Sequence, residues 1–259
     1  MAFLAGVMAG CGHHKTSSAP QTAPPIETEQ AEADTGGAGS AAADVPRTRT
    51  PQASRIPITP VPPGGITAED IRYVNTHPPI GTEVGLATWY SAPYKGRKAA
   101  NGEVFEDYAL TAAHRTLPMG SLIVVTNLKT GQWSAMRITD RGPFVDGRIL
   151  DLTIASAKAT GVYRAGLVRV RVDVYQTPKP IETGGRWCVQ IGAFHNEEQA
   201  LRLKAQLQVK YPDASVIEFP GADSYWVRIR PQGDNRELAE AIASRLRPAE
   251  GEAFLTRLD

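Results

Sequence analysis

Proline and aromatic residues are distributed unevenly along this chain of 259 residues. Residues 12–82 contain 11 of the 20 prolines but only one aromatic residue, Tyr73, among runs of Ala, Thr, Gly, Ser and Glu. A segment of this composition cannot bury enough apolar surface to offset the entropy lost on folding. We therefore expect residues 12–82 to be a disordered linker and the folded part of the chain to follow it.

The first residues of the chain end in a cysteine. The run "FLAGVMAGC" is apolar, too short to span a bilayer, and similar to the end of a secretory signal, although no Lys or Arg precedes it. Its last four residues resemble the lipobox of bacterial lipoproteins, in which the cysteine is acylated. The resemblance implies a signal peptide over residues 1–11 and a lipid anchor on Cys11, with the linker as a spacer of roughly 45–50 Å. The alternative is a chance cysteine after a short apolar run.

The formal net charge of +1 gives no reason to expect a nucleic-acid partner. The two cysteines, Cys11 and Cys188, are separated by the whole linker, so we expect no disulfide between them and no function for Cys188. His13 and His14 belong to the linker, and no Cys/His spacing resembles a zinc site. We predict neither a metal nor a cofactor.

Short strand-like runs separated by turn residues follow the linker. Four valines, at 168, 170, 172 and 174, alternate with charged residues as in a half-buried strand. One short helix is expected after Thr153, which is a suitable N-cap. Residues 83–177 therefore predict a compact β-barrel, built from the runs "GLATWYS", "SLIVVTN", "QWSAMRIT" and "LVRVRVDVYQ".

A second domain is predicted over residues 186–259, after a short linker at 178–185. Its pattern is β-α-β-β-α-β, with Asn196 as the cap of the first helix, so the chain as a whole is mainly β plus α+β. Strand alternation places two apolar sets under the helices: Trp187, Val189 and Ile191, and Tyr225, Val227 and Ile229.

The opposite face of that sheet is then left uncovered. It presents Gln190, Trp226, Arg228 and Arg230, which offer an aromatic ring, an amide and two cations to a sugar polymer that carries carboxylates. Alternatively, Trp226 packs under a loop and the arginines only keep the domain soluble.

Several ungapped motifs resemble known families. "GLATWYS", "ANGEVFEDYALTAAHRTLPMGSLIVVTN" and "MRITDRGPFVDGRILDL" resemble the double-psi β-barrel of the rare lipoprotein A family, septal lytic transglycosylases of bacterial peptidoglycan. "WCVQIGAF" through "YWVRIRP" resembles a SPOR domain, which binds glycan strands stripped of their stem peptides. This resemblance covers nearly everything after residue 84. It implies a monomeric lipoprotein at the division septum whose partner is the peptidoglycan glycan, and Gly12 after the cysteine favours the periplasmic side of the outer membrane.

A lytic transglycosylase protonates the oxygen between two amino sugars and then deprotonates the C6 hydroxyl of one of them, which closes a 1,6-anhydro ring. The resemblance carries Glu103, His114 and Asp140 into the active site, and Asp151 matches an acidic position of less certain role. We assign Asp140 as general acid and base, Glu103 as the carboxylate that stabilises the developing cation, and His114 as an orienting partner. Asp140 and Glu103 could exchange roles.

Other interpretations stay open. Asp140 could be a turn or ion-pair residue, and His114 could hold its loop through a backbone hydrogen bond. Arg141 and Arg148 could bind sugar oxygens or lock the barrel's loops. Trp89 and Tyr90 are neighbours on a strand and face opposite sides, so at most one of them faces a groove and the other belongs to the core. For the whole protein, the alternatives are a non-catalytic septal peptidoglycan-binding lipoprotein and a hydrolase that uses water.

Overall fold

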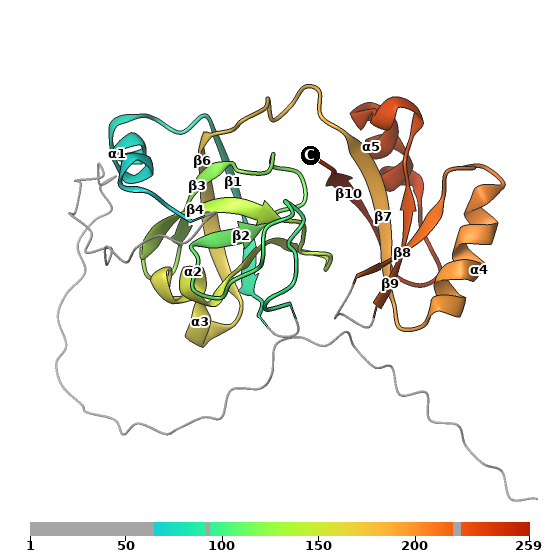
Figure 1. The fold of residues 1–259 in the computed structure, drawn as a ribbon, viewed down its shortest axis with the longest axis horizontal. Helices are drawn as coiled ribbons and strands as arrows, with labels where there is room; N and C mark the ends of the chain where they lie inside the picture. The colour runs from blue at the N-terminus through green and yellow to red at the C-terminus, as the bar shows by residue number, and fades with distance from the viewer. Residues whose placement is uncertain (1–64, 92–93, 220–223) are drawn as a thin grey trace, which may run out of the picture. The chain divides into compact units, whose positions relative to one another are not determined.

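The computed structural model describes residues 65–91, 94–219 and 224–259. The predicted signal peptide, the anchor on Cys11 and most of the predicted linker lie outside these ranges. No helix within them is long and apolar enough to cross a membrane. Two β structures follow one another along the described chain (Figure 1). Each has its own apolar core.

The first structure is a closed six-stranded barrel with the strand order β1-β5-β2-β4-β3-β6. Strand β1 runs parallel to β5, and β2 runs parallel to β4, whereas the other four pairings are antiparallel. The strands are β1 (Gly81–Trp89), β2 (Thr111–Ala113), β3 (Leu122–Asn127), β4 (Trp133–Asp140), β5 (Arg148–Leu152) and β6 (Val168–Gln176). The predicted barrel is therefore confirmed.

The barrel core is built by alternation along its strands. Val168, Val170, Val172 and Val174 of β6 are all buried, as their spacing predicts. Burial of each such side chain stabilises the fold by roughly 1.5–3 kcal/mol. The expected short helix is α2 (Ile154–Ala159), capped by the Thr153 side chain, and a second short helix, α3 (Val162–Ala165), leads into β6.

The predicted linker is wrong over its last part, because residues 66–82 are folded. Helix α1 (Ala68–Thr76) begins with a capping box in which Thr67 and Asp70 satisfy each other's backbone N–H groups. Ile66 and Val74 are buried against residues of β3, β4 and β6 on the outside of the barrel. The composition of the whole segment conceals this short amphipathic stretch, which is stabilised by its contact with the barrel rather than by its own residues.

The second structure is an antiparallel sheet with the strand order β10-β7-β9-β8 and two main helices. In chain order its elements are β7 (Trp187–Phe194), α4 (Glu197–Gln208), β8 (Ser215–Phe219), β9 (Ser224–Ile229), the 3-10 turn η1 (Gln232–Asp234), α5 (Arg236–Arg245) and β10 (Glu252–Arg257). The predicted β-α-β-β-α-β order is confirmed, and Asn196 caps α4 as expected. Trp187, Val189 and Ile191 pack with both helices.

The contact between α1 and β4 predicts how a substitution at Asp70 changes the free energy of unfolding. Oδ1 of the buried Asp70 lies 2.5 Å from Nη2 of Arg137 on β4, and Oδ2 accepts the backbone N–H of Thr67. Asp70→Ala removes both interactions, so we expect the free energy of unfolding to fall by about 1–3 kcal/mol. Glu69→Ala, at the exposed neighbouring position, should change it by no more than about 0.5 kcal/mol. Urea denaturation measures both variants, and equal effects would show that the ion pair does not hold α1.

Candidate active site

Strand pairing brings four residues of four barrel strands into one row. Thr88 of β1 pairs with Asp151 of β5, Asp151 pairs with Ala113 of β2, and Ala113 pairs with Asp140 of β4. Residues that pair directly across a sheet project their side chains to the same face. The row therefore gathers two carboxyl groups that are far apart in sequence, with the methyl group of Ala113 between them.

Asp140 is the last residue of β4 and accepts three hydrogen bonds. Its Oδ1 accepts the backbone N–H groups of Ala100, at 3.0 Å, and Arg141, at 2.8 Å. Its Oδ2 accepts the Tyr90 hydroxyl at 3.3 Å. Burial raises the pKa of Asp140 above its usual value, although these hydrogen bonds and the Arg141 charge oppose the rise. The pKa of this carboxyl is thus shifted in the direction that acid catalysis requires.

Asp151 is held by two neighbours. Its Oδ1 accepts the hydroxyl of Thr88 and lies 3.9 Å from Nη2 of Arg148. Burial also raises the pKa of Asp151, against the effects of Arg148, Thr88 and Arg115. Oδ2 of Asp151 lies close to Gly142, in the turn after Asp140: a methyl group placed on Gly142 would be 3.6 Å from this oxygen.

Tyr90 is a site residue whose contact the sequence did not reveal. Burial raises the pKa of its phenol well above the usual value, and the charges of Asp140 and Asp151 raise it further, so the phenol stays a hydrogen-bond donor. Trp89 packs against the barrel core and Tyr163. The prediction that these neighbours face opposite sides is confirmed.

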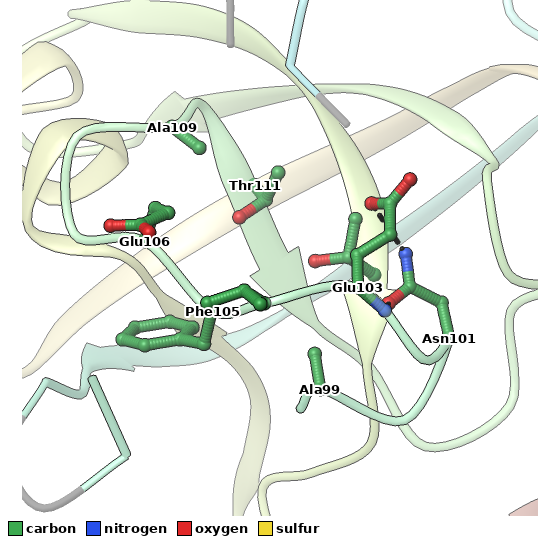
Figure 2. Close-up of a pocket in the computed structure, with 9 residues that line it drawn as sticks. Ala99, Asn101, Glu103, Phe105, Glu106, Ala109 and Thr111 are labelled. Atoms are coloured by element: carbon green, nitrogen blue, oxygen red, sulfur yellow. Dashed lines mark hydrogen bonds between the residues drawn. The ribbon is translucent and has the colours of Figure 1, made fainter. Parts of the chain in front are cut away.

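Glu103 belongs to a loop that lies against the end of β4. The backbone N–H of Asn101 donates to the carbonyl of Thr139, next to the contact of Ala100 with Asp140. Glu103 is exposed, and its Oε2 accepts the amide of Asn101 at 2.8 Å (Figure 2). The loop borders a small hollow with room for about 10 Å³, which Glu103 lines together with Asn101, Phe105 and Thr139. The structure therefore brings Glu103 and Asp140 to the same end of the barrel.

His114 is buried, and both of its ring nitrogens are engaged away from the carboxyl row. Nδ1 accepts the backbone N–H groups of Thr116, at 3.1 Å, and Leu117, at 3.0 Å. The ring proton must therefore be on Nε2, which donates to Oε2 of Glu83 at 3.0 Å. This bond lowers the pKa of Glu83. The geometry fits the alternative interpretation of His114 as a residue that holds its loop, and does not fit an orienting partner of Asp140.

Arg141 also differs from its predicted role in substrate binding. Its Nη1 donates to the carbonyl oxygens of His114, at 3.0 Å, and Leu117, at 2.8 Å. Burial lowers the pKa of its guanidinium to about 10. Since these donors are used by the backbone, Arg141 locks the 114–117 turn, whereas Arg148 lies beside Asp151.

In the second domain, two residues of the predicted uncovered face have little accessible surface. Gln190 is 0% exposed and Trp226 is 6% exposed. The indole ring lies on Gly192, where a Cβ atom would come within 2.6 Å of it, and its Nε1 contacts the Ser224 hydroxyl. The glycine therefore opens the space that the ring fills.

The arginines of this face remain partly accessible: Arg228 is half-buried and Arg230 is exposed. Nη2 of Arg228 donates to Oε1 of Gln190 at 3.2 Å, and Arg230 forms an ion pair with Asp234. Among the described residues, Nε2 of Gln190 and Nε of Arg228 have no hydrogen-bond partner.

Within the described ranges, no group of three or more His, Cys, Asp or Glu side chains is arranged to hold a metal ion. Cys188 is a buried free thiol, and burial raises its pKa to about 11. The chemistry that this arrangement offers is proton transfer by carboxyl groups.

Comparisons with known proteins agree with this division of the chain. A family model described as lytic transglycolase matches residues 82–172, and a SPOR domain model matches residues 183–257.

Three curated relatives illustrate the similarity. The probable endolytic peptidoglycan transglycosylase RlpA of Synechocystis sp. is 50% identical over 92 residues, 36% of this chain and 29% of that protein. The endolytic peptidoglycan transglycosylase RlpA of Vibrio cholerae is 46% identical over 99 residues, 38% of each chain. The protein of the same name from Campylobacter jejuni is 33% identical over 190 residues, 62% of this chain and 69% of that protein. The chain thus spans 29% and 38% of the first two relatives.

The contacts of His114 predict the relative stability of two variants at this position. His114→Asn offers a carbonyl oxygen that can accept the N–H groups of Thr116 or Leu117, whereas His114→Ala leaves both buried donors without an acceptor. We expect the Ala variant to be less stable than the Asn variant by about 1–3 kcal/mol. Chemical denaturation compares the two, and long-range ¹H–¹⁵N correlation spectra of the unsubstituted protein should show the proton on Nε2. A proton on Nδ1 would contradict this assignment.

Proposed function

Because this chain belongs to the family of the endolytic peptidoglycan transglycosylase RlpA, we propose that its barrel cleaves peptidoglycan glycan strands and leaves 1,6-anhydro-muramyl ends. The observation that carries this proposal is Asp140. It is a half-buried carboxyl with a raised pKa, fixed by three donors at the end of a barrel strand. The match of the barrel to the lytic transglycolase model supports the same reaction class.

The reaction begins with a proton on Asp140. This proton passes to the oxygen between two sugars as the C1–O bond breaks, and positive charge develops at C1. The ionised Asp140 then takes the proton of the C6 hydroxyl, whose oxygen bonds to C1 and closes the anhydro ring. Glu103, on the adjacent loop, supplies a carboxylate that stabilises the cation. Tyr90 and the backbone donors keep Asp140 in place between the two steps.

The second domain is proposed to hold the glycan strand. The match to the SPOR domain model supports this role. We assign this role to Arg228, which is half-buried, and to Gln190, whose Oε1 accepts a hydrogen bond from the Arg228 guanidinium. Because Trp226 is buried, recognition on this face depends on polar groups rather than on an exposed stacking ring.

The cellular setting is proposed from the sequence. An acyl chain on Cys11 would anchor a monomeric protein in the outer membrane, and the segment after it would let the barrel reach the wall from the periplasmic side. Binding to glycan strands without stem peptides would concentrate the protein at the division septum.

Incubation of naked glycan strands with the purified protein, followed by mass analysis of the products, tests the reaction. We expect anhydro ends with the unsubstituted protein and a loss of at least a hundredfold in rate with Asp140→Asn, which cannot donate a proton. Asp146→Asn, an exposed carboxyl six residues later, is the matched control and should cleave normally. Reducing ends would identify a hydrolase, and intact strands would identify a binding protein.

Glycan binding by the second domain is tested separately. Arg228→Gln removes a charged donor, so we expect the Kd for naked glycan to rise by about tenfold or more. Arg202→Gln changes an exposed arginine on helix α4 and should leave the Kd unchanged. Sedimentation with naked glycan measures both variants, and an unchanged Kd for Arg228→Gln would remove this residue from the binding face.

A further inference from the structure

The row Thr88–Asp151–Ala113–Asp140 contains a carboxyl that the proposed reaction leaves unused. We propose that Asp151 is a catalytic residue of the barrel, which donates the proton to the glycosidic oxygen while Asp140 acts as the base. This proposal rests on the proposed function and divides between two carboxyls the steps assigned above to Asp140 alone.

The first argument is the position of Asp151. Asp151 and Asp140 both pair with Ala113, from opposite sides of β2, so their Cα atoms are separated by two strand spacings, about 10 Å. Ala113 is the residue between them in this row. Two carboxyl side chains that project from this spacing on the same face can flank a single glycosidic bond, as the acid and base pairs of sugar-cleaving enzymes do.

The second argument is the direction of the Asp151 carboxyl. A methyl group on Gly142 would lie 3.6 Å from Oδ2 of Asp151 and 3.7 Å from Cβ of Ala113. Gly142 is two residues after Asp140. Oδ2 of Asp151 therefore reaches over Ala113 toward the turn after Asp140, while Oδ1 is held on the other side by Thr88.

The third argument is the different set of donors at each carboxyl. Two backbone N–H groups and the Tyr90 hydroxyl all point at Asp140, and backbone donors can only pair with lone pairs. This arrangement suits an ionised base. Asp151 accepts one hydroxyl, from Thr88, so its Oδ2 can keep a proton to donate.

The charged groups around Asp151 are Arg148, at 3.9 Å, and Arg115, and both favour its ionised form. Burial outweighs them and raises the pKa of Asp151. The phenols of Tyr90 and Tyr94 also face both carboxyls and stay neutral, because burial raises their pKa. The site thus favours a proton on one of two neighbouring acids.

Glu103 is the alternative partner for Asp140, and its environment is different. Its side chain is exposed and bonded to Asn101 on a loop. An exposed carboxyl that already accepts an amide suits the stabilisation of a cation better than proton donation.

The proposed step balances. The proton of Asp151 moves to the oxygen that leaves C1, and this oxygen becomes a hydroxyl group of the departing sugar. The C6 oxygen bonds to C1, and its proton moves to Asp140. Exchange with water at the half-buried rim then returns a proton to Asp151 and removes one from Asp140, so no further reactant is required.

The test is the steady-state cleavage of naked glycan by the full chain, with anhydro ends counted across a range of pH. We expect Asp151→Asn to lower kcat by 10²–10⁴-fold with little change in KM or melting temperature. The unsubstituted protein should lose activity at high pH, where Asp151 is ionised, and the residual activity of Asp151→Asn should lack this basic limb. Asp146→Asn should match the unsubstituted protein throughout.

Should Asp151→Asn fail to fold, Asp151→Glu keeps a carboxyl and should move the basic limb to a different pH. Normal cleavage by Asp151→Asn, or an unmoved basic limb in either variant, would overturn the role of Asp151 while the proposed function stands. Intact glycan after incubation with the unsubstituted protein would overturn both.

Discussion

The pairing of the short strand β2 with β4 on one side and β5 on the other is the constraint on which the candidate site depends. Strand β2 has three residues, yet it closes the barrel between two strands that approach it in opposite directions. Ala113 is thereby level with the last residue of β4, Asp140, and with the second-last residue of β5, Asp151. The positions of Asp140 and Asp151 are set by backbone hydrogen bonds between strands rather than by loops. Glu103 has no such support, because its loop is attached to β4 through Ala100 and Asn101.

A balance between burial and hydrogen bonding sets the chemistry of this row. Burial alone would keep both carboxyls protonated, whereas three donors alone would keep Asp140 ionised over the whole physiological range. The structure combines the two, and burial outweighs the donors, so the pKa of each carboxyl is raised. The hydrogen bond from Tyr90 lowers the pKa of Asp140. Because the pKa of Tyr90 itself is raised, its phenol keeps its proton and stays a hydrogen-bond donor. The same balance explains why Arg141, adjacent in sequence, is compatible with the site: its Nη1 is turned to the carbonyl groups of the 114–117 turn.

Local patterns predicted the elements of the fold, and the same patterns could not predict how distant elements meet. The valines of β6 and the caps at Thr153 and Asn196 depend on residues close together in sequence, and the structure confirms all of them. Helix α1 was missed because much of its stability comes from contacts with distant barrel residues, among them the ion pair of Asp70 with Arg137, 67 positions away. The row through Ala113 and the contact of Tyr90 with Asp140 depend on register between strands that are not neighbours in sequence. His114 was an intermediate case, since Thr116 and Leu117 are local partners but Glu83 is not.

If the second domain binds glycan as proposed, its polar groups give a physical reason why a stacking platform is not needed. A buried donor without an acceptor costs the folded protein about 1–3 kcal/mol, and Nε2 of Gln190 and Nε of Arg228 are two such donors among the described residues. A glycan strand carries hydroxyl, amide and carboxylate oxygens along its whole length, so it can supply the missing acceptors and recover that free energy on binding. The bond between Arg228 and Gln190 fixes both side chains before the ligand arrives, which reduces the entropy lost on association. Trp226, folded onto Gly192, then acts as the rigid support of these polar groups rather than as a surface for sugar rings.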